Sequence, residues 1–411
     1  MKVKKLLKII DGKGNNISGS FNKIKFDSRL SNKNDLFIAI NDGYKYIDDA
    51  LKKDCKVVSE VDRNDVIKVE NSIKALGKIA AYKRQNFNKP VIAITGSNGK
   101  TTTKDLIYQV LSKKYKVLKN DKNKNNDIGL PETLLDLNEK YDMCVLELGM
   151  NHFGEIDYLA NICKPDYAII TNIGSAHIGN LGNKRNILKA KLEIKKYSKN
   201  LIVNGNDKYL KKIKNAKKVS LKELKDITYF IDKTEFNYNN THFTFNIPGK
   251  HLLIDVLFAI KIGLIYDVDI SDIKDAISEY QTIEGRMNII KGDYTIFDDC
   301  YNANYESLKG SLNVIKNDNR LKIIILADML ELGKNSKKYH KKINKILKKI
   351  KNKEVLLIGE YTKYIKGKHF NNNDELYDYL VSILKKDSLV YVKGSHAFNL
   401  KVIVDKIKNL E

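Results

Sequence analysis

VIAITGSNGKTTT, residues 91–103, is the stretch that decides the fold. Residues 91–94 are apolar and predict a buried strand, and a Gly-x-x-Gly turn from Gly96 to Gly99 follows directly. Lys100 and three threonines then open a segment, residues 105–111, whose apolar residues recur with helical spacing. A strand, a loop and a helix in this order predict a phosphate-binding loop.

The residue types of this loop suit a polyphosphate. Glycine adopts backbone angles that are closed to other residues, so consecutive N–H groups can turn inward at a helix N-terminus. Lys100 would reach the outer phosphates and Thr101 would ligate Mg²⁺. A chance glycine-rich turn is the alternative, because Ile94 stands where the common pattern has its first glycine. The flanking strand and helix favour the nucleotide, which we expect to contact Gly96, Ser97, Asn98, Gly99, Lys100, Thr101 and Thr102.

Length and composition narrow the class of protein. A chain of 411 residues is too long for one ordinary core and predicts two to four domains. No apolar run approaches the roughly 20 residues that span a bilayer, so we expect no membrane insertion. Lysines interrupt the apolar part of residues 1–12, which therefore do not resemble a signal peptide. The 4 cysteines form no Cys-x-x-Cys pair, which argues against disulfides and zinc and fits a reducing cytoplasm.

The chain is strongly basic, with 74 Lys and Arg against 50 Asp and Glu and a formal charge of +24. Such a charge raises the possibility of nucleic-acid binding. The lysines are spread over the whole chain, however, and no basic block interleaved with aromatic residues is present. A lysine- and asparagine-rich proteome and small anionic substrates explain the charge better, so we expect no nucleic-acid partner.

The order of predicted elements indicates an α/β protein with three domains. Residues 1–88 read as a small N-terminal α/β domain, and Pro90 marks the joint because it disfavours helix just before it. Residues 89–283 form the central phosphate-loop domain, in which strands alternating with helices predict a mainly parallel sheet. Residues 284–411 alternate in the same way and predict a C-terminal Rossmann-like α/β domain.

Two polar side chains follow predicted strands of the central sheet. Glu147 ends the strand at residues 143–149, and His177 follows the strand at residues 167–173. In open α/β sheets the carboxyl ends of the strands hold the ligand, so both would face Thr101 across one edge. A lone histidine after a strand more often makes a structural hydrogen bond. The coincidence beside a phosphate loop instead favours a metal site.

Further motifs follow in a fixed order and cover nearly the whole chain. They are Asn125-Asn-Asp-Ile-Gly-Leu-Pro131, Glu147-Leu-Gly-Met-Asn151, Thr171-Asn-Ile-Gly-Ser-Ala-His177, Ala190-Lys-Leu-Glu-Ile194, Gly285-Arg-Met287, Asp298-Asp-Cys-Tyr-Asn-Ala-Asn304, Asp328-Met-Leu-Glu-Leu-Gly333 and Lys393-Gly-Ser395. Taken together with the loop, these motifs resemble those of the Mur ligase family. The runs at 298–304 and 328–333 are typical of members that add a dipeptide, and the Asp-Asn-Pro-Arg signature of the diaminopimelate- or lysine-adding members is absent.

The resemblance implies an activity. It predicts an ATP-dependent amide ligase of peptidoglycan synthesis, cytoplasmic and monomeric, with UDP-N-acetylmuramoyl-tripeptide and D-alanyl-D-alanine as substrates. ATP would phosphorylate the tripeptide carboxylate, and the dipeptide amine would attack the acyl phosphate. Most of the catalytic work is then the positioning and neutralisation of anions. The alternatives are a Mur-type ligase with another acceptor, a non-catalytic nucleotide-binding relative, and a basic NTPase that binds nucleic acid.

The resemblance also implies roles for individual residues. Lys100 and Arg286 would balance the phosphates, and Asp299 would contact the ribose. ATP and Mg²⁺ would be the cofactors, with a carbamylated lysine completing a metal set of Thr101, Glu147, His177 and Lys191. The UDP-sugar peptide would be held by Ser28, Arg29, Asn126 and Asn302.

The chain departs from the family pattern at the predicted adenine site. Leu252 and Asp255 stand where the family usually has asparagine, so its adenine contact does not carry over directly, although Asp255 could still accept a hydrogen bond from the exocyclic amine of adenine. The loop at residues 41–44 is also shorter than usual, which leaves the uridine contacts open.

Overall fold

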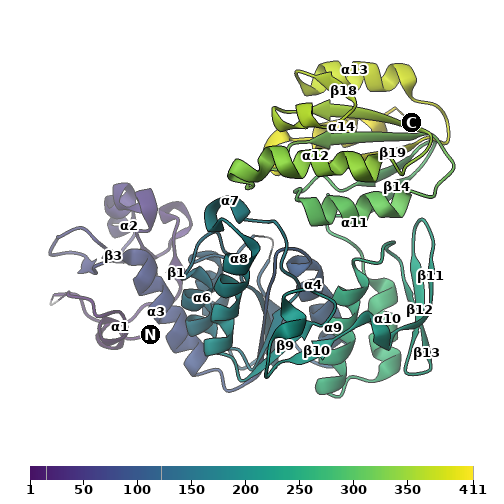
Figure 1. Cartoon of the computed structure of the whole chain (residues 1–411). Helices are drawn as coiled ribbons and strands as arrows, with labels where there is room; N and C mark the ends of the chain where they lie inside the picture. The colour runs from purple at the N-terminus through teal and green to yellow at the C-terminus, as the bar shows by residue number, and fades with distance from the viewer. Residues whose placement is uncertain (15, 122, 411) are drawn as a thin grey trace.

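A computed structural model describes residues 1–14, 16–121 and 123–410. The chain is arranged in three consecutive parts, with the N-terminal part and the C-terminal part at opposite ends of a central one (Figure 1). The α/β class predicted from the sequence is confirmed. The boundaries at residues 88 and 283 stay predictions.

The first part is a parallel sheet with helices packed on it. Its strands run in the order β1 (Ile24–Lys25), β2 (Leu36–Ile38), β3 (Lys56–Ser59) and β4 (Ile67–Lys68). Its helices are α1 (Val3–Ile10), α2 (Ile47–Lys52) and α3 (Ser72–Gln85). The α3 helix begins after Asn71, whose side chain accepts a hydrogen bond from Lys74 N at 2.7 Å. The α3 helix also packs against two helices of the central part, α5 (Gly129–Leu135) and α6 (Glu155–Cys163), and so connects the two parts.

The central part is built on a six-stranded parallel sheet. The strands lie in the order β10 (Lys217–Val219), β9 (Asn200–Asn204), β8 (Tyr167–Ile170), β5 (Val91–Thr95), β7 (Met143–Glu147) and β6 (Val117–Lys119). The helices are α4 (Lys100–Ser112), α5 (Gly129–Leu135), α6 (Glu155–Cys163), α7 (Ile178–Leu181), α8 (Lys184–Lys191), α9 (Leu253–Ile265) and α10 (Ile270–Glu279). Since β5 lies between β7 and β8, the loops after these three strands meet at one edge.

A small antiparallel sheet extends the central part and was not predicted. It consists of β11 (Lys225–Tyr229), β12 (Thr234–Tyr238) and β13 (Thr241–Phe245). Buried residues alternate with half-buried ones along β12, and Phe236 stacks on Phe243 with ring centroids 5.3 Å apart. The sheet stands beside α9 and α10 and faces the C-terminal part (Figure 1).

The third part is a mixed six-stranded sheet. Its order is β14 (Asn288–Lys291), β15 (Thr295–Asp298), β19 (Leu389–Lys393), β16 (Lys322–Ala327), β17 (Lys353–Ile358) and β18 (Lys368–Phe370), and only the β14–β15 pair is antiparallel among the described residues. The helices are α11 (Tyr305–Ile315), α12 (Ser336–Leu347), α13 (Asn373–Ile383) and α14 (Lys401–Lys408). Figure 1 shows α11 on the side of this sheet that faces the central part.

Short 3₁₀ segments complete the described chain. They are η1 (Ser28–Leu30), η2 (Asn41–Tyr46), η3 (Leu192–Lys196), η4 (Leu210–Lys212), η5 (Leu221–Glu223), η6 (Gly333–Asn335), η7 (Tyr361–Tyr364) and η8 (His396–Phe398). The motif at residues 190–194 therefore begins at the end of α8 and continues into η3. Within residues 1–14, 16–121 and 123–410, no helix is both long enough and apolar enough to cross a bilayer.

Candidate active site

The predicted phosphate loop lies between β5 and α4. Gly99 has φ of +76°, and a Cβ added there would lie 2.5 Å from Asp255 Oδ1, so glycine is required. The loop is anchored to the end of β8, because Ser97 N donates to Asn172 O at 3.1 Å and Asn98 N to Asn172 Oδ1 at 3.0 Å. These two N–H groups are therefore used in hydrogen bonds within the protein. The first N–H groups of α4 have no partner within the helix and remain for an anion.

Glu147 meets Thr101 at the edge of the sheet, as predicted. Thr101 Oγ1 donates to Glu147 Oε2 at 2.7 Å, and Asn125 Nδ2 donates to Oε1 at 2.8 Å. The Glu147 side chain is buried, and Asn120 holds its backbone N–H at 2.8 Å. Asn125 begins the motif at residues 125–131, in which only Asn126 was predicted to contact a ligand. Its amide fixes the carboxylate in place.

Two lysines lie close together beside this carboxylate. Lys100 Nζ donates to Gly96 O at 3.1 Å. Burial lowers the pKa of Lys100, Arg286 lowers it further and Glu147 opposes the change. Lys191, at the end of α8, is only 1% exposed, and burial together with Lys100 lowers the pKa of its amine well below the ordinary value. The site therefore favours the neutral amine of Lys191.

His177 lies at the N-terminus of α7 with φ of +60°. Burial, Lys100 and Lys191 lower the pKa of its imidazole to about 3, so the ring is neutral at pH 7. Its Nδ1 lies 3.1 Å from Oε2 of Glu331, a residue of the third part that the sequence analysis did not assign to the site. Burial raises the pKa of Glu331. Its place in the Asp-Met-Leu-Glu-Leu-Gly run was the only signal for it in the sequence.

Arg286 reaches the site from the third part. Its guanidinium lies over the Tyr301 ring, 4.2 Å from the centroid. The turn that carries Arg286 is held at both sides, because Gly285 N donates to Asp298 Oδ2 at 3.2 Å and Met287 N to Asp299 Oδ1 at 3.3 Å.

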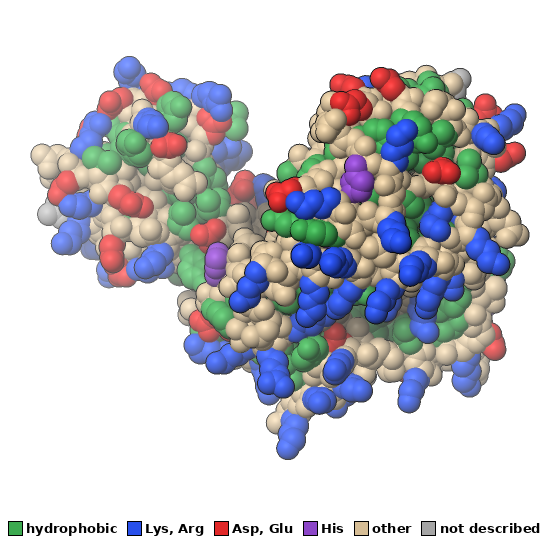
Figure 2. All heavy atoms as spheres, turned by 45° about the horizontal axis from the view of Figure 1, so that its top comes forward, with side chains coloured by type: hydrophobic (Ala, Val, Ile, Leu, Met, Phe, Trp, Pro, Cys, Tyr) green, Lys and Arg blue, Asp and Glu red, His purple; other side chains and the backbone are tan. Residues whose placement is uncertain are grey.

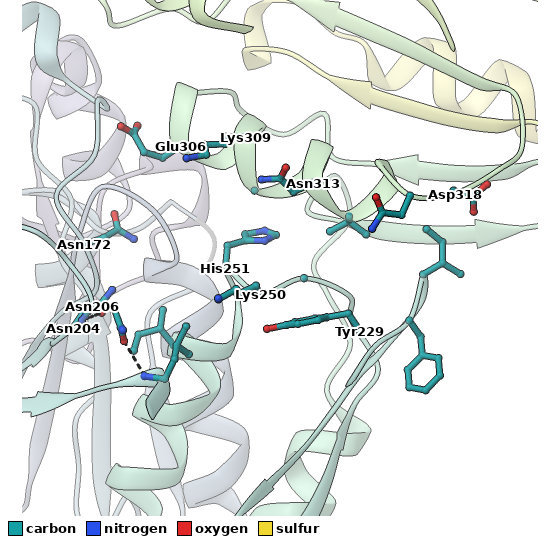
Figure 3. A pocket seen from close by; sticks show the side chains of 18 residues that line it. Asn172, Asn204, Asn206, Tyr229, Lys250, His251, Glu306, Lys309, Asn313 and Asp318 are labelled. Carbon is teal, nitrogen blue, oxygen red and sulfur yellow. Dashed lines mark hydrogen bonds between the residues drawn. The ribbon is translucent and has the colours of Figure 1, made fainter. Parts of the chain in front are cut away.

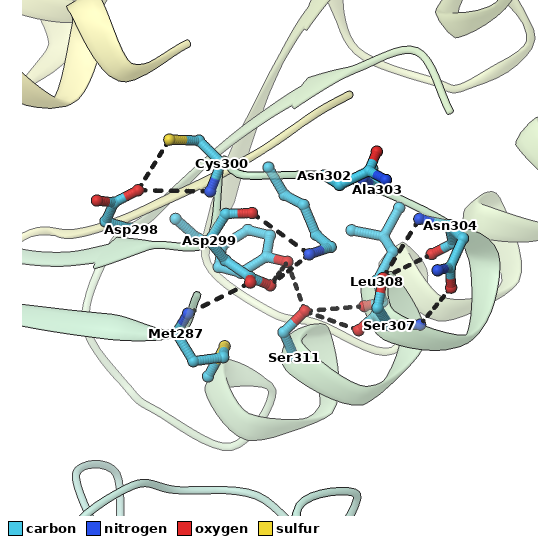
Figure 4. Close-up of polar contacts among 12 residues, drawn as sticks. Met287, Asp298, Asp299, Cys300, Asn302, Ala303, Asn304, Ser307, Leu308 and Ser311 are labelled. Carbon is cyan, nitrogen blue, oxygen red and sulfur yellow. Dashed lines mark hydrogen bonds and ion pairs between the residues drawn. The ribbon is translucent and has the colours of Figure 1, made fainter. Parts of the chain in front are cut away.

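Asp299 is engaged by the protein itself (Figure 4). Lys393 Nζ contacts its Oδ2 at 2.7 Å, and Tyr391 OH donates to the same oxygen at 3.3 Å. Asp299 does line a cavity of about 230 Å³ together with Arg286 and the phosphate loop. The predicted ribose contact would use a carboxylate that Lys393 already orients. Lys393 itself, in the motif at residues 393–395, was not predicted to belong to the site.

The donor atoms fit the implied Mg²⁺. The Thr101 hydroxyl and the Glu147 carboxylate supply the hard oxygen ligands that this ion prefers, and His177 is neutral and available. Among the described residues, no group of three His, Cys, Asp or Glu side chains is placed to hold a metal. Glu147 is thus the anionic ligand among the three, and the predicted carbamate of Lys191, which would supply a second one, stays a prediction.

Two larger cavities adjoin the loop. One, of about 660 Å³, is lined by Lys100, Thr101, Glu147 and His177, and extends to Asn71 and Lys74 at the start of α3. Asn126 and Asn302 also line it, and their predicted contact with the substrate stays a prediction. This cavity therefore connects the first part of the chain with the predicted metal site.

The other cavity, of about 750 Å³, lies between the small antiparallel sheet, α9 and α11 (Figure 3). It shares Asn172, His251 and Glu306 with the loop cavity, so the two cavities adjoin each other. Figure 3 shows the Tyr229 side chain reaching toward His251 and Lys250. Asp255 is buried beside the loop, where Thr103 Oγ1 donates to it at 2.9 Å, and burial raises its pKa well above the ordinary value.

Ser28 and Arg29 lie on the first part of the chain and line none of these three cavities. Ser28 is buried, and Lys53 Nζ donates to its carbonyl at 2.8 Å. The exposed Arg29 guanidinium pairs with Asp27 at 2.8 Å. Their predicted contact with the UDP group stays a prediction.

Comparison with known proteins places these residues in a family. Residues 94–263 match the Mur ligase middle domain, and residues 285–396 match the Mur ligase, glutamate ligase domain. The chain belongs to the Mur ligase family. Both matches include residues of the site, since Lys100 and Glu147 fall in the first and Arg286 in the second.

Individual Mur ligases align over most of the chain. It is 34% identical to the UDP-N-acetylmuramoyl-tripeptide--D-alanyl-D-alanine ligase of Rickettsia prowazekii over 93% of this chain and 94% of that one. The protein of the same name from Bacillus subtilis is 31% identical over 92% and 91%.

Solved Mur ligases have the same fold. The structure of MurF from Acinetobacter baumannii superposes with a TM-score of 0.91 at 27% identity, covering 98% and 97% of the two chains. The MurF ligase from Thermotoga maritima, solved in complex with ADP, superposes with a TM-score of 0.85 at 28% identity, covering 93% and 96%.

Proposed function

We propose that this Mur ligase joins D-alanyl-D-alanine to UDP-N-acetylmuramoyl-tripeptide at the expense of ATP. One observation carries the proposal. Lys100, Glu147 and Arg286 together line the two cavities next to the phosphate loop. The relatives named for this reaction align over more than nine-tenths of the chain. A cytoplasmic monomer is the state we propose for it.

ATP would bind across the central and third parts. The phosphates would lie against the N-terminus of α4, with Lys100 and Arg286 neutralising their charge. The base would enter the 750 Å³ cavity beside His251 and Tyr229. The structure of the ADP-bound relative supports a nucleotide at this fold. Asp255, held by Thr103 next to Gly99, would serve the loop rather than the base.

The chemistry would proceed in two steps. A terminal carboxylate oxygen of the tripeptide would attack the γ-phosphorus, and the bond to the β–γ bridging oxygen would break to release ADP. The dipeptide amine would then attack the acyl carbon, lose a proton and expel phosphate as the amide forms. Lys100 and Arg286 would hold the charge that moves between the oxygens, which is where such donors have their largest effect.

Mg²⁺ would be held by Thr101, Glu147 and His177, with Lys191 as a carbamate. When bound, this ion would neutralise phosphate charge and orient the transferring group. The neutral amine of Lys191 is the form that reacts with CO₂, and its burial beside Lys100 favours that form. The anionic carbamate would then be stabilised by the same positive surroundings.

A coupling assay tests the function. Purified protein with ATP and Mg²⁺ should release ADP only when UDP-N-acetylmuramoyl-tripeptide and D-alanyl-D-alanine are both present. Free lysine or diaminopimelate, offered with the precursor shortened by one residue, serves as the control acceptor. Equal turnover with those single amino acids would overturn the choice of acceptor, and ADP release without any acceptor would overturn the ligase.

A further inference from the structure

Glu306, in the first turn of α11, joins the third part of the chain to the central part. Its Oε2 accepts hydrogen bonds from Ser175 N at 2.8 Å and from Ser175 Oγ at 2.5 Å. Its Oε1 accepts from Lys184 Nζ at 2.7 Å. Ser175 lies in the loop after β8, and Lys184 begins α8, so one carboxylate holds two separate segments of the central part.

The loop that Glu306 holds is the one that carries His177. Ser175 is fully buried and lies two residues before this histidine. Gly174 fills the space between the phosphate loop and α11, because a Cβ added there would lie 3.0 Å from Ser97 Cβ and 3.1 Å from Glu306 Oε2. The loop is therefore packed between two elements that belong to different parts of the chain.

Neighbouring contacts place the same face of the third part against the site. Asn304 caps α11 and also donates through Nδ2 to Asn98 Oδ1 of the phosphate loop. On the other side, Gly179 N of α7 donates to Glu331 O at 2.8 Å. The third part is thus linked to the phosphate loop through α11, and to α7 through Glu331 in the segment after β16.

Lys184 neutralises the carboxylate. The ion pair is half-buried, with side chains 27% and 29% exposed for Lys184 and Glu306. Burial alone would raise the pKa of Glu306, but Lys184 and Ser175 lower it below the ordinary value. Glu306 lines both the 230 Å³ and the 750 Å³ cavities, where the proposed function places a polyphosphate and its nucleoside. An unpaired carboxylate here would repel ATP.

We propose that Glu306 is a positioning residue that makes the course of the Ser175–His177 loop depend on docking of α11, with Lys184 as the counter-charge that keeps this contact compatible with ATP. The proposal rests on the proposed function, because it assigns the phosphates to the adjoining cavity. It goes further in naming the contact through which the third part of the chain acts on His177.

Four variants distinguish the positioning role of Glu306 from the charge neutralisation by Lys184. Glu306→Ala should lower kcat by about tenfold or more, because Ser175 N and Oγ lose a charged acceptor in a buried place. Lys184→Met should leave kcat nearly unchanged and raise the KM for ATP by about threefold, in line with the loss of one half-exposed ion pair. Glu306→Gln keeps an acceptor for Ser175 and should retain most of kcat. The double variant Lys184→Met/Glu306→Gln removes the unpaired charge and should bring the KM for ATP back toward the wild-type value.

Matched controls come from ion pairs inside the central part. Lys261 and Glu223 are 2.6 Å apart with side chains 31% and 29% exposed, and Glu235 pairs with Lys233 at 2.7 Å and is 24% exposed. Lys261→Met and Glu235→Ala should leave kcat and the KM for ATP within twofold of wild type. A Glu306→Ala enzyme that matches Glu235→Ala in kcat overturns the proposal, as does a Lys184→Met enzyme whose KM for ATP matches Lys261→Met.

Two further measurements, wild-type turnover and ATP binding, test this proposal separately from the proposed function. Turnover of the wild type with D-alanyl-D-alanine supports the function whatever the variants do. If the wild type does not use the dipeptide, ATP binding measured by calorimetry replaces the KM and needs no acceptor. Weaker ATP binding by Lys184→Met, restored in the double variant, would still support the contact, and unchanged binding would reject it. Urea unfolding midpoints identify any variant that fails to fold, and the Lys184→Met comparison then decides.

Discussion

Lys191 and Lys322 are both buried, 1% and 0% exposed, but their surroundings differ. Lys322, in β16, donates through Nζ to Asp318 O at 2.7 Å and to Arg320 O at 2.8 Å, which ties the turn before the strand to the strand itself. Lys191 lies instead near a second cation, Lys100, and the Glu147 carboxylate. Burial lowers the pKa of both lysines.

The neighbours of a buried lysine, and not its burial, distinguish a structural lysine from a functional one. Lysine is almost never fully buried unless its charge is compensated, so each case needs an explanation. Backbone carbonyls explain Lys322, which holds a turn. Lys191 lies between opposing charges, because Lys100 lowers the pKa of its amine and Glu147 raises it, and burial shifts the balance toward the neutral form. Burial alone would have grouped the two residues together.

The largest expected effect is that of Lys191→Ala. Turnover should fall by more than about 100-fold, because the variant loses the amine that we propose to become an anionic metal ligand. A short-chain carboxylate in the buffer should restore part of the activity. Lys189→Ala, at an exposed position of the same helix, is the control and should keep full activity. If Lys191→Ala kept wild-type turnover, Lys191 would be a structural lysine like Lys322.

Lys100→Ala should lower turnover by about 100-fold, the size expected when one donor that stabilises moving charge is removed. The cause differs from that of Lys191→Ala, so no carboxylate in the buffer should rescue this variant. Lys113→Ala, at the far end of α4 and paired with Glu279, gives the background effect of losing a lysine from that helix. More than half of the wild-type turnover would argue against the phosphate-loop assignment.

Lys322→Met should affect stability and not catalysis. Two half-buried carbonyls would lose their donor, which costs about 1 kcal/mol in the free energy of unfolding. The urea unfolding midpoint measures the loss, and kcat should remain within twofold of wild type. Lys338→Met, at an exposed position of α12, should change neither quantity. A large fall in kcat at an unchanged urea midpoint would show that Lys322 has a functional role and not a structural one.

The smallest expected effect is a pH dependence caused by His177. Its pKa of about 3 in the folded chain lies below the ordinary value near 6.5, so the unfolded chain binds more protons between these values. The stabilisation is complete above about pH 6.5 and is lost as the pH falls through that window. Between pH 7.5 and 6.0 the loss should be about 1 kcal/mol.

Urea midpoints at the two pH values measure this loss. His177→Gln should flatten the dependence, and His242→Gln, at an exposed position, should leave it as in the wild type. His340 in the third part provides the comparison, because burial lowers its pKa too while its charged neighbour, Asp328 at 3.7 Å, opposes the shift. An unchanged pH dependence in His177→Gln would mean that the cations near this residue do not set its charge.

Local signals predicted the central part well. The apolar run of β5, the Gly-x-x-Gly turn and the periodicity of α4 are contiguous in the chain, so the sequence contains the whole phosphate loop. The third-part strands were predicted for the same reason, because buried parallel strands read as continuous apolar runs. The small sheet of β11, β12 and β13 was missed since its strands mix polar and aromatic residues without a strong period.

The sequence by itself determined the fold class, the family and the residue types of the site. Residues such as Lys100, Thr101 and Glu147 could be assigned because each follows a strand whose direction the α/β pattern dictates. These are properties of short stretches of chain, where side-chain spacing and backbone preference act over a few residues.

Only the tertiary structure decided which groups meet. Glu331 and Glu306 come from the third part of the chain, more than 100 residues after the loops that they contact, and nothing in their own neighbourhood indicates a partner. The same holds for Lys191, whose ammonium is disfavoured only because folding buries it and brings Lys100 near. Burial and the field of distant charges depend on how the parts pack, so the protonation of these groups could not be read from the chain.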